Sequence, residues 1–168
     1  MADVSGLKNL DVALLARRLG KLCVAQNVTL TTAESCTGGG IASMITSAAG
    51  SSAYFETGFV TYSNAAKTRL LGVSTETLDA KGAVSEAVVD EMVRGACRES
   101  GADLGVAVSG VAGPGGGSAD KPVGLVWLSV GNEREQRAQR FVFPGDRQAV
   151  REQAVREAMI ALILRLSR

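Results

Sequence analysis

The chain has 168 residues, of which 46% are hydrophobic and 21% charged, and its formal net charge is +1. These values are ordinary for one globular domain and argue against the strongly charged surfaces that bind nucleic acids or membranes, so we expect a single domain over residues 1–168. Three widely spaced cysteines and no histidine argue against a disulfide framework and a zinc site, and they exclude a histidine-based catalytic triad within the chain.

The N-terminal half of the chain alternates predicted helices and strands. Apolar residues at helical spacing and β-branched runs predict a helix over Asp11–Gln26, a strand over Val28–Ala33, a helix over Thr37–Ala49, a strand over Phe55–Tyr62 and a helix over Ala65–Leu71. Gly58 is a candidate β-bulge in the second strand. Asn64 is the expected N-cap of the last of these helices, and Gly72 is its expected end.

The C-terminal half continues the alternation and adds a hairpin. The pattern predicts a short helix capped by Ser74, a helix from Ser85 to about Ser100, a strand over Leu104–Ser109, a hairpin of strands over Leu125–Val130 and Ala138–Phe143, and a last helix that follows Pro144-Gly145-Asp146 and runs to Leu166. This order predicts an α/β fold, namely a three-layer α/β/α single domain with a mixed β-sheet. Ligands of such sheets bind where strands lead into helices.

The sharpest motif is ESCTGGG, residues 34–40, between a predicted strand and a predicted helix. The Ser35 hydroxyl is expected to face the positive end of that helix, and the N–H groups from Cys36 to Gly38 are candidates to hold an oxyanion. Thr37 and Gly38 are therefore candidate substrate contacts. The competing interpretation is that Ser35 or Thr37 merely caps the helix. Cys36 is a rival nucleophile, but with no histidine to activate it we interpret it as a small buried residue.

The second motif, TYSNAAK over residues 61–67, places Tyr62 and Lys67 just after the next predicted strand. A lysine acts as a general base when burial or neighbouring cations lower its pKa. In a hydrolase without histidine, lysine is the natural activator of a serine. On local grounds alone, a solvated surface lysine is the commoner outcome.

A glycine-rich loop, SGVAGPGGGS, follows the predicted strand that ends at Ser109. Its N–H groups, those of Gly113 and Gly115 among them, can form an anion-binding nest, although no Walker A sequence closes the loop. The alternative is a mobile connector. Further on, Asp146 is the expected N-cap of the last helix, and Arg147 beside it suits a bidentate contact with phosphate. The alternative there is a plain cap with an exposed arginine.

Taken together, six segments resemble the C-terminal domain of the CinA family: TTAESCTGG, GFVTYSNAAK, GAVSE, SGVAGPGGGS, KPVGLVW and GDR. They follow the order of that family and cover nearly the whole chain, from about Leu10 to Leu166. The resemblance implies an α/β/α fold with a mixed sheet. It also implies hydrolysis of nicotinamide mononucleotide to nicotinate mononucleotide and ammonia, a step of pyridine nucleotide recycling. Longer members carry an additional N-terminal domain, which this sequence does not include.

The resemblance further implies a Ser/Lys amidase site. Ser35 matches the family's nucleophile, Lys67 its base, and Tyr62 the tyrosine that relays or steadies the proton. Ser109 and Arg147 match residues that support the site.

From the sequence and the resemblance we expect no metal or organic cofactor, a small-molecule nucleotide substrate, and neither a nucleic-acid nor a membrane partner. The substrate phosphate is expected on the loop 113–117, on Arg147, or on both. A cytoplasmic location is expected, since no signal peptide or membrane-spanning run is evident, and homo-oligomer formation stays open. Two alternatives also stay open: a non-catalytic nucleotide-binding module, and a hydrolase that uses the same residues on another small amide.

Overall fold

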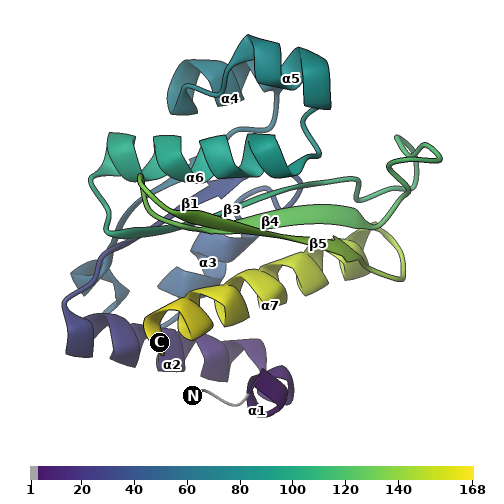
Figure 1. Ribbon diagram of the computed structural model, residues 1–168. Helices are drawn as coiled ribbons and strands as arrows, with labels where there is room; N and C mark the ends of the chain where they lie inside the picture. The colour runs from purple at the N-terminus through teal and green to yellow at the C-terminus, as the bar shows by residue number, and fades with distance from the viewer. Residues whose placement is uncertain (1–3) are drawn as a thin grey trace.

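Five strands form a mixed sheet at the centre of the fold (Figure 1). The computed structural model describes residues 4–168, so the first three residues of the predicted domain lie outside the described part. In their order across the sheet, the strands are β2 (Phe55–Val60), β1 (Leu30–Glu34), β3 (Leu104–Gly110), β4 (Leu125–Gly131) and β5 (Gln136–Val142). β1 is parallel to β2 and β3, whereas β4 is antiparallel to β3 and β5. The predicted mixed sheet and late hairpin are confirmed.

Helices cover both faces of the sheet (Figure 1). On one face lie α7 (Arg147–Leu166) and α3 (Gly40–Thr46), with α2 (Val12–Gln26) and α1 (Val4–Lys8) packed below them. On the other face α6 (Glu86–Ser100) contacts all five strands, and α4 (Asn64–Leu71) and α5 (Thr75–Lys81) pack on the outer side of α6. The predicted three-layer α/β/α architecture is confirmed, with α4 and α5 on one side and α1 and α2 on the other as partial outer layers.

Each face of the sheet buries its own apolar core. Val106 and Val108 of β3 pack in the core beneath α7, and Ala107 between them packs in the core beneath α6. Alternate side chains of a strand point to opposite faces, so a central strand that is covered on both sides must be apolar throughout. This is why β3 has a continuous apolar sequence rather than an alternating one.

Local capping side chains begin most of the longer helices. Three predicted caps accept a backbone N–H from the residue three positions later: Ser74, Ser85 and Asp146. At α4 the prediction is wrong by one residue. The cap is Ser63, whose Oγ accepts the Ala66 N–H at 3.1 Å, and the predicted cap Asn64 is the first helical residue. Serine and asparagine cap helices about equally well, so the local sequence does not separate them.

The helix predicted over Thr37–Ala49 is shorter in the structure, where α3 begins at Gly40 and ends at Thr46. Gly38 and Gly39 have φ values of +59° and +101°. Both values lie in the left-handed region, which a right-handed helix excludes. Thr37 and the two glycines therefore form a turn between β1 and α3.

The irregularity in β2 also differs from the prediction. The β1–β2 register shifts at Glu56, which has no partner across the pair, while Gly58 pairs regularly with Thr32. The β-bulge predicted at Gly58 is therefore wrong. The strand ends at Val60 rather than at Tyr62, and α1 and a 3-10 turn over Ser51–Ala53 were not predicted. Both of these unpredicted elements are too short to carry a periodic apolar signal.

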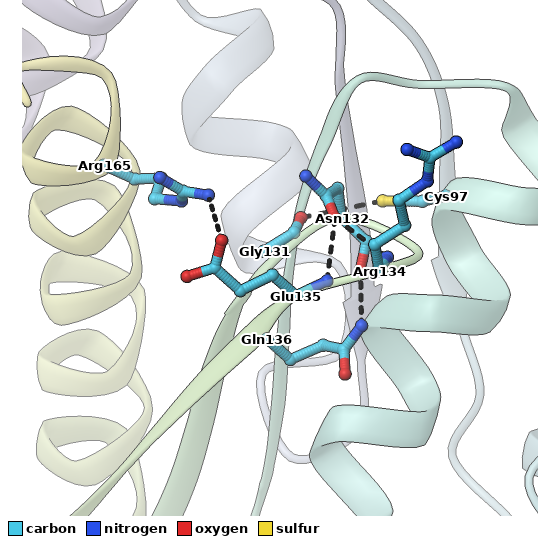
Figure 2. A network of polar contacts seen from close by, with 7 residues as sticks. All are labelled: Cys97, Gly131, Asn132, Arg134, Glu135, Gln136 and Arg165. Carbon is cyan, nitrogen blue, oxygen red and sulfur yellow. Dashed lines mark hydrogen bonds and ion pairs between the residues drawn. The ribbon is translucent and has the colours of Figure 1, made fainter.

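The β4–β5 turn is tied to its neighbours by a polar network (Figure 2). The Asn132 side-chain oxygen accepts the Glu135 N–H at 2.9 Å, and the Glu135 carboxylate pairs with Arg165 of α7 at 3.2 Å. Gly131, just before this turn, pairs with Gly105 near the start of β3. The network thus fixes the hairpin against α7 at the end of the sheet opposite to the sequence motifs.

Helix α6 approaches α4 closely at Gly95, where a Cβ atom would lie 1.9 Å from the Leu71 carbonyl oxygen. We expect Gly95→Ala to push the helices apart and to lower the free energy of unfolding by about 3 kcal/mol, although alanine is the better helix former by about 1 kcal/mol. For a chain of this length, Tm then falls by about 6–12 °C, which thermal unfolding measures. Gly101→Ala, at a left-handed position in open space after the same helix, is the control and costs only about 1–2 kcal/mol. A Gly95→Ala variant with unchanged Tm would contradict this close packing.

Candidate active site

Three parallel strands end together at one edge of the sheet. Glu34, the last residue of β1, pairs with Val60 on β2 and with Val108 on β3. The Ser35 N–H continues this pattern by donating to the Val108 carbonyl at 3.1 Å, and the Thr61 N–H donates to the Glu34 carbonyl at 2.9 Å. Ser35 therefore lies between the ends of β2 and β3, at the edge where ligands of parallel sheets bind.

The structure brings the Lys67 amine to the Ser35 hydroxyl. Lys67 extends from α4, and its Nζ lies 3.0 Å from Ser35 Oγ, 2.8 Å from the Thr61 carbonyl oxygen and 3.2 Å from that of Tyr62. Lys67 is only 1% exposed, although lysine is among the residues least often buried. The interpretation of Lys67 as a solvated surface residue is therefore wrong.

The surroundings of Lys67 lower the pKa of its amine. Burial lowers the pKa of the amine, because desolvation penalises the ammonium, while the nearby Cys36 acts weakly in the opposite direction. Among residues 4–168, no carboxylate lies within ion-pair distance of Nζ. The carbonyl oxygens of Thr61 and Tyr62 can only accept hydrogen bonds. In the structure Nζ donates to Ser35 Oγ as well. Once the amine is neutral, its two N–H groups can go to the two carbonyls, which leaves its lone pair for the Ser35 O–H.

The rival nucleophile next to Ser35 is a poor one. Cys36 is buried, and burial raises the pKa of its thiol to about 11. The thiolate, which is the reactive form, is therefore scarce at neutral pH.

The Glu34 carboxylate, which sequence reasoning missed, occupies the start of α3. Its oxygens accept the Thr37 hydroxyl at 2.6 Å and the N–H groups of Ile41 and Ala42 at 2.8 Å and 3.0 Å. The N-cap of this helix is a glycine without a side chain, so a carboxylate from the end of the preceding strand takes over the capping. The first N–H groups of α3 are thus taken by Glu34 rather than by Ser35.

Within the described residues, the turn after Ser35 leaves three N–H groups free, those of Cys36, Thr37 and Gly39. The Gly38 N–H donates to the Ser35 carbonyl and the Gly40 N–H to the Thr37 carbonyl, each at 3.0 Å. Within the described part of the chain, the N–H groups of Cys36 and Thr37 have no protein acceptor. Of the three predicted oxyanion donors, Gly38 is therefore engaged, while Cys36 and Thr37 are available.

The Tyr62 side chain does not lie at the Ser35–Lys67 contact. Its ring is on the surface, with the residue 61% exposed, and its hydroxyl accepts from Arg147 Nη2 at 3.0 Å. The same arginine donates from Nη1 to the Gly113 carbonyl at 2.9 Å. Tyr62 meets Lys67 through its backbone carbonyl alone, and Arg147 ties two loops together across the edge of the sheet.

The remaining predicted residues lie around this edge at different distances from Ser35. Continuing the β1–β3 register by one residue places the buried Ser109 beside Ser35. Gly113 is buried and holds Arg147 through its carbonyl, whereas Gly115 lies in an exposed part of the loop.

A cleft of about 910 Å³ opens next to this edge, within the size range of small-molecule sites. Two predicted residues, Thr37 and Arg147, line it together with apolar side chains such as Met44, Ala112 and Val155. Ser35 and Lys67 do not line the cleft themselves, and Thr37 connects it to them.

Arg151, which lines the cleft, is a second residue that sequence reasoning missed. Its Nε donates to the Cys36 carbonyl at 3.0 Å and its Nη2 to the Thr37 carbonyl at 3.2 Å. Arg151 lies four residues after Arg147, one turn along α7, so helical spacing was the signal that places both on one face.

The described residues, 4–168, lack two features. They contain no group of three or more Cys, Asp or Glu side chains placed to hold a metal ion. They also contain no helix that is long and apolar enough to cross a membrane.

The chain is similar to known proteins in both sequence and fold. Residues 12–166 match the family model described as the CinA C-terminal domain. The chain is 56% identical over 152 residues to the nicotinamide-nucleotide amidohydrolase PncC of Pseudomonas putida, covering 90% of this chain and 95% of that protein. Its identity to the PncC protein of Escherichia coli is 53% over 153 residues, covering 90% and 93%. A crystal structure of a CinA superfamily protein from Klebsiella pneumoniae superposes with a TM-score of 0.90 at 43% identity, over 94% of this chain and 99% of that one.

Proposed function

The chain belongs to the CinA C-terminal domain family, and on that basis we propose that it is an amidohydrolase that converts nicotinamide mononucleotide to nicotinate mononucleotide and ammonia. The names of its relatives support the substrate. The observation that carries the chemistry is the 3.0 Å contact between a buried lysine amine, Lys67 Nζ, and Ser35 Oγ. Because substrate and product are both pyridine nucleotides, we assign the reaction to pyridine nucleotide recycling.

In the proposed mechanism Ser35 is the nucleophile and Lys67 the general base. Neutral Lys67 accepts the Ser35 proton as Oγ attacks the carboxamide carbon, and the carbonyl oxygen becomes an oxyanion. The free N–H groups of Cys36 and Thr37 are the proposed donors to that oxyanion. Lys67 then gives its proton to the departing nitrogen, and ammonia leaves an ester on Ser35. Water, deprotonated by Lys67, cleaves this ester and restores the Ser35 hydroxyl.

Tyr62 and Arg147 are proposed to support this reaction from the rim of the site. The Tyr62 carbonyl accepts from Lys67 Nζ, which helps to orient the amine toward Ser35. The Tyr62 hydroxyl can take part in the proton transfer only if its ring moves away from Arg147, to which it is now hydrogen-bonded. Arg147 lines the cleft, and its guanidinium suits a phosphate. The nucleotide phosphate is therefore placed against Arg147, and the carboxamide toward Thr37 and Ser35.

The purified protein is expected to release one ammonia for each nicotinate mononucleotide formed from nicotinamide mononucleotide. Because the proposed mechanism uses only protein groups, prior treatment with EDTA should leave the rate unchanged. A coupled ammonia assay with chromatography of the nucleotides measures both results. Binding of the mononucleotide without turnover would instead assign a non-catalytic nucleotide-binding module. Turnover confined to other members of a panel of small amides would assign a different substrate to the same residues.

A further inference from the structure

We infer that Arg151 is a positioning residue that orients the two peptide groups after the nucleophile, so that the Thr37 N–H faces the Ser35 side of the turn. The inference rests on the proposed function, because it gives that N–H the task of binding the oxyanion. Arg151 reaches the turn from α7, which is far from the turn in the sequence. Among the described hydrogen bonds, Arg151 contacts neither Ser35 Oγ nor Lys67 Nζ.

The contacts of Arg151 fix two consecutive carbonyls. The planar guanidinium donates from Nε to the Cys36 oxygen and from Nη2 to the Thr37 oxygen, at 3.0 Å and 3.2 Å. Hydrogen bonds from a charged donor are stronger than neutral ones, and a rigid two-point fork also sets direction. The fit is close, since a Cβ atom on Gly38 would lie 3.4 Å from Arg151 Nη2.

The planarity of the peptide bond converts these contacts into an orientation of N–H groups. In a trans peptide the C=O and the following N–H point in opposite directions. The Thr37 carbonyl points at Arg151, and the Gly38 N–H accordingly points away from it, to the Ser35 carbonyl at 3.0 Å. The Cys36 carbonyl also points at Arg151, so the Thr37 N–H likewise points away from Arg151. We infer that it lies on the side of Ser35. A donor held there is preorganised for the oxyanion that forms beside Ser35 Oγ.

The turn is held from its other side by Glu34. The Glu34 carboxylate accepts the Thr37 hydroxyl at 2.6 Å and joins the turn to α3, but as an acceptor it cannot donate to a carbonyl. Glu34 therefore fixes where the turn lies, and Arg151 fixes which way its peptide groups face. Without Arg151, the peptide between Cys36 and Thr37 loses the donor that keeps its N–H on the Ser35 side.

The test compares Arg151→Met and Arg151→Lys with Arg156→Met as a matched control. Arg156 lies on the same helix and also donates to two backbone carbonyls, those of Lys8 and Leu10, away from the Ser35 turn. Steady-state kinetics are measured with nicotinamide mononucleotide and with nicotinamide riboside, which lacks the phosphate, and Tm is measured for each variant. We expect Arg151→Met to lower kcat by about 10- to 100-fold on both substrates, with KM within about twofold of the wild type. Arg151→Lys should recover part of kcat, because an ammonium is a compact charge that can hold one of the two carbonyls but lacks the rigid fork that holds both.

Several outcomes would overturn the inference. One is a kcat for Arg151→Met that matches Arg156→Met, because the arginine would then act on stability alone. Another is a rise in KM confined to the phosphorylated substrate, which would make Arg151 a phosphate ligand. A third is a wild-type kcat in Arg151→Lys, because the two-point contact of the guanidinium would then not be required.

A separate measurement distinguishes failure of this inference from failure of the proposed function. If the wild type releases no ammonia from nicotinamide mononucleotide, the proposed function fails. The rate at which a fluorophosphonate labels Ser35, followed by mass spectrometry, still reports on oxyanion stabilisation without any nucleotide. Slower labelling of Arg151→Met than of Arg156→Met supports the positioning role, and equal labelling rejects it.

Discussion

Ser35→Ala is expected to lower kcat for ammonia release from nicotinamide mononucleotide by about 10⁴-fold or more, because the variant lacks the atom that attacks the carboxamide. The Ser35 side chain contacts Lys67 Nζ and makes no other hydrogen bond within the described residues, so we expect Tm to change by only a few degrees. Affinity for the nucleotide should also be nearly unchanged, since the cleft and its arginines remain. Single-turnover ammonia assays and calorimetric titration with the nucleotide measure the two effects.

The neighbouring thiol provides the sharpest check on this result. If Ser35→Ala kept substantial activity, and a cysteine-alkylating reagent then abolished it, Cys36 would be the nucleophile instead. The raised pKa of the Cys36 thiol, about 11, argues that no such activity will be found at neutral pH.

Lys67→Met is expected to lower kcat by about 10³-fold or more while preserving the apolar stem of the side chain. In the wild type, kcat should rise with pH as Lys67 loses its proton, and the midpoint should lie below the ordinary lysine value of 10.5, because burial lowers the pKa of this amine. The pH–rate profile of ammonia release measures this midpoint. Lys81→Met, at an exposed lysine on the neighbouring helix α5, is the control and should keep both the rate and the profile. A wild-type profile that stayed flat, with an active Lys67→Met, would remove lysine from the mechanism.

The same pKa shift predicts how the stability of the protein depends on pH. Between the lowered pKa of Lys67 in the folded protein and 10.5, the unfolded chain binds more protons at this site than the folded one. The free energy of unfolding of the wild type, relative to Lys67→Met, should therefore increase as pH rises through that window. Above 10.5 the difference should level off, since the amine is then neutral in both states. Parallel denaturant titrations of the two proteins at several pH values between about 7 and 10 test this sign.

Side chains that act on their own neighbours in the chain are the part of this fold that sequence reasoning handles well. The caps Ser74, Ser85 and Asp146 were predicted and are present, because each accepts an N–H only three residues away. The errors lie where a distant group competes with a local rule. At the start of α3 the capping acceptor is Glu34, five residues before the N-cap glycine and outside the usual range of a cap.

The amino-acid sequence by itself determined the layered α/β architecture, the absence of histidine and the presence of a serine and a lysine after adjacent strands. Only the tertiary structure decided that Lys67 is buried against Ser35, 32 positions away, and that Arg151 reaches the Cys36 carbonyl across 115 positions. The physical reason is one of range. Periodicity and capping depend on groups within a turn or two of the chain, whereas these contacts depend on strand register and on how α4 and α7 pack. Those relations bring together residues that no local pattern connects.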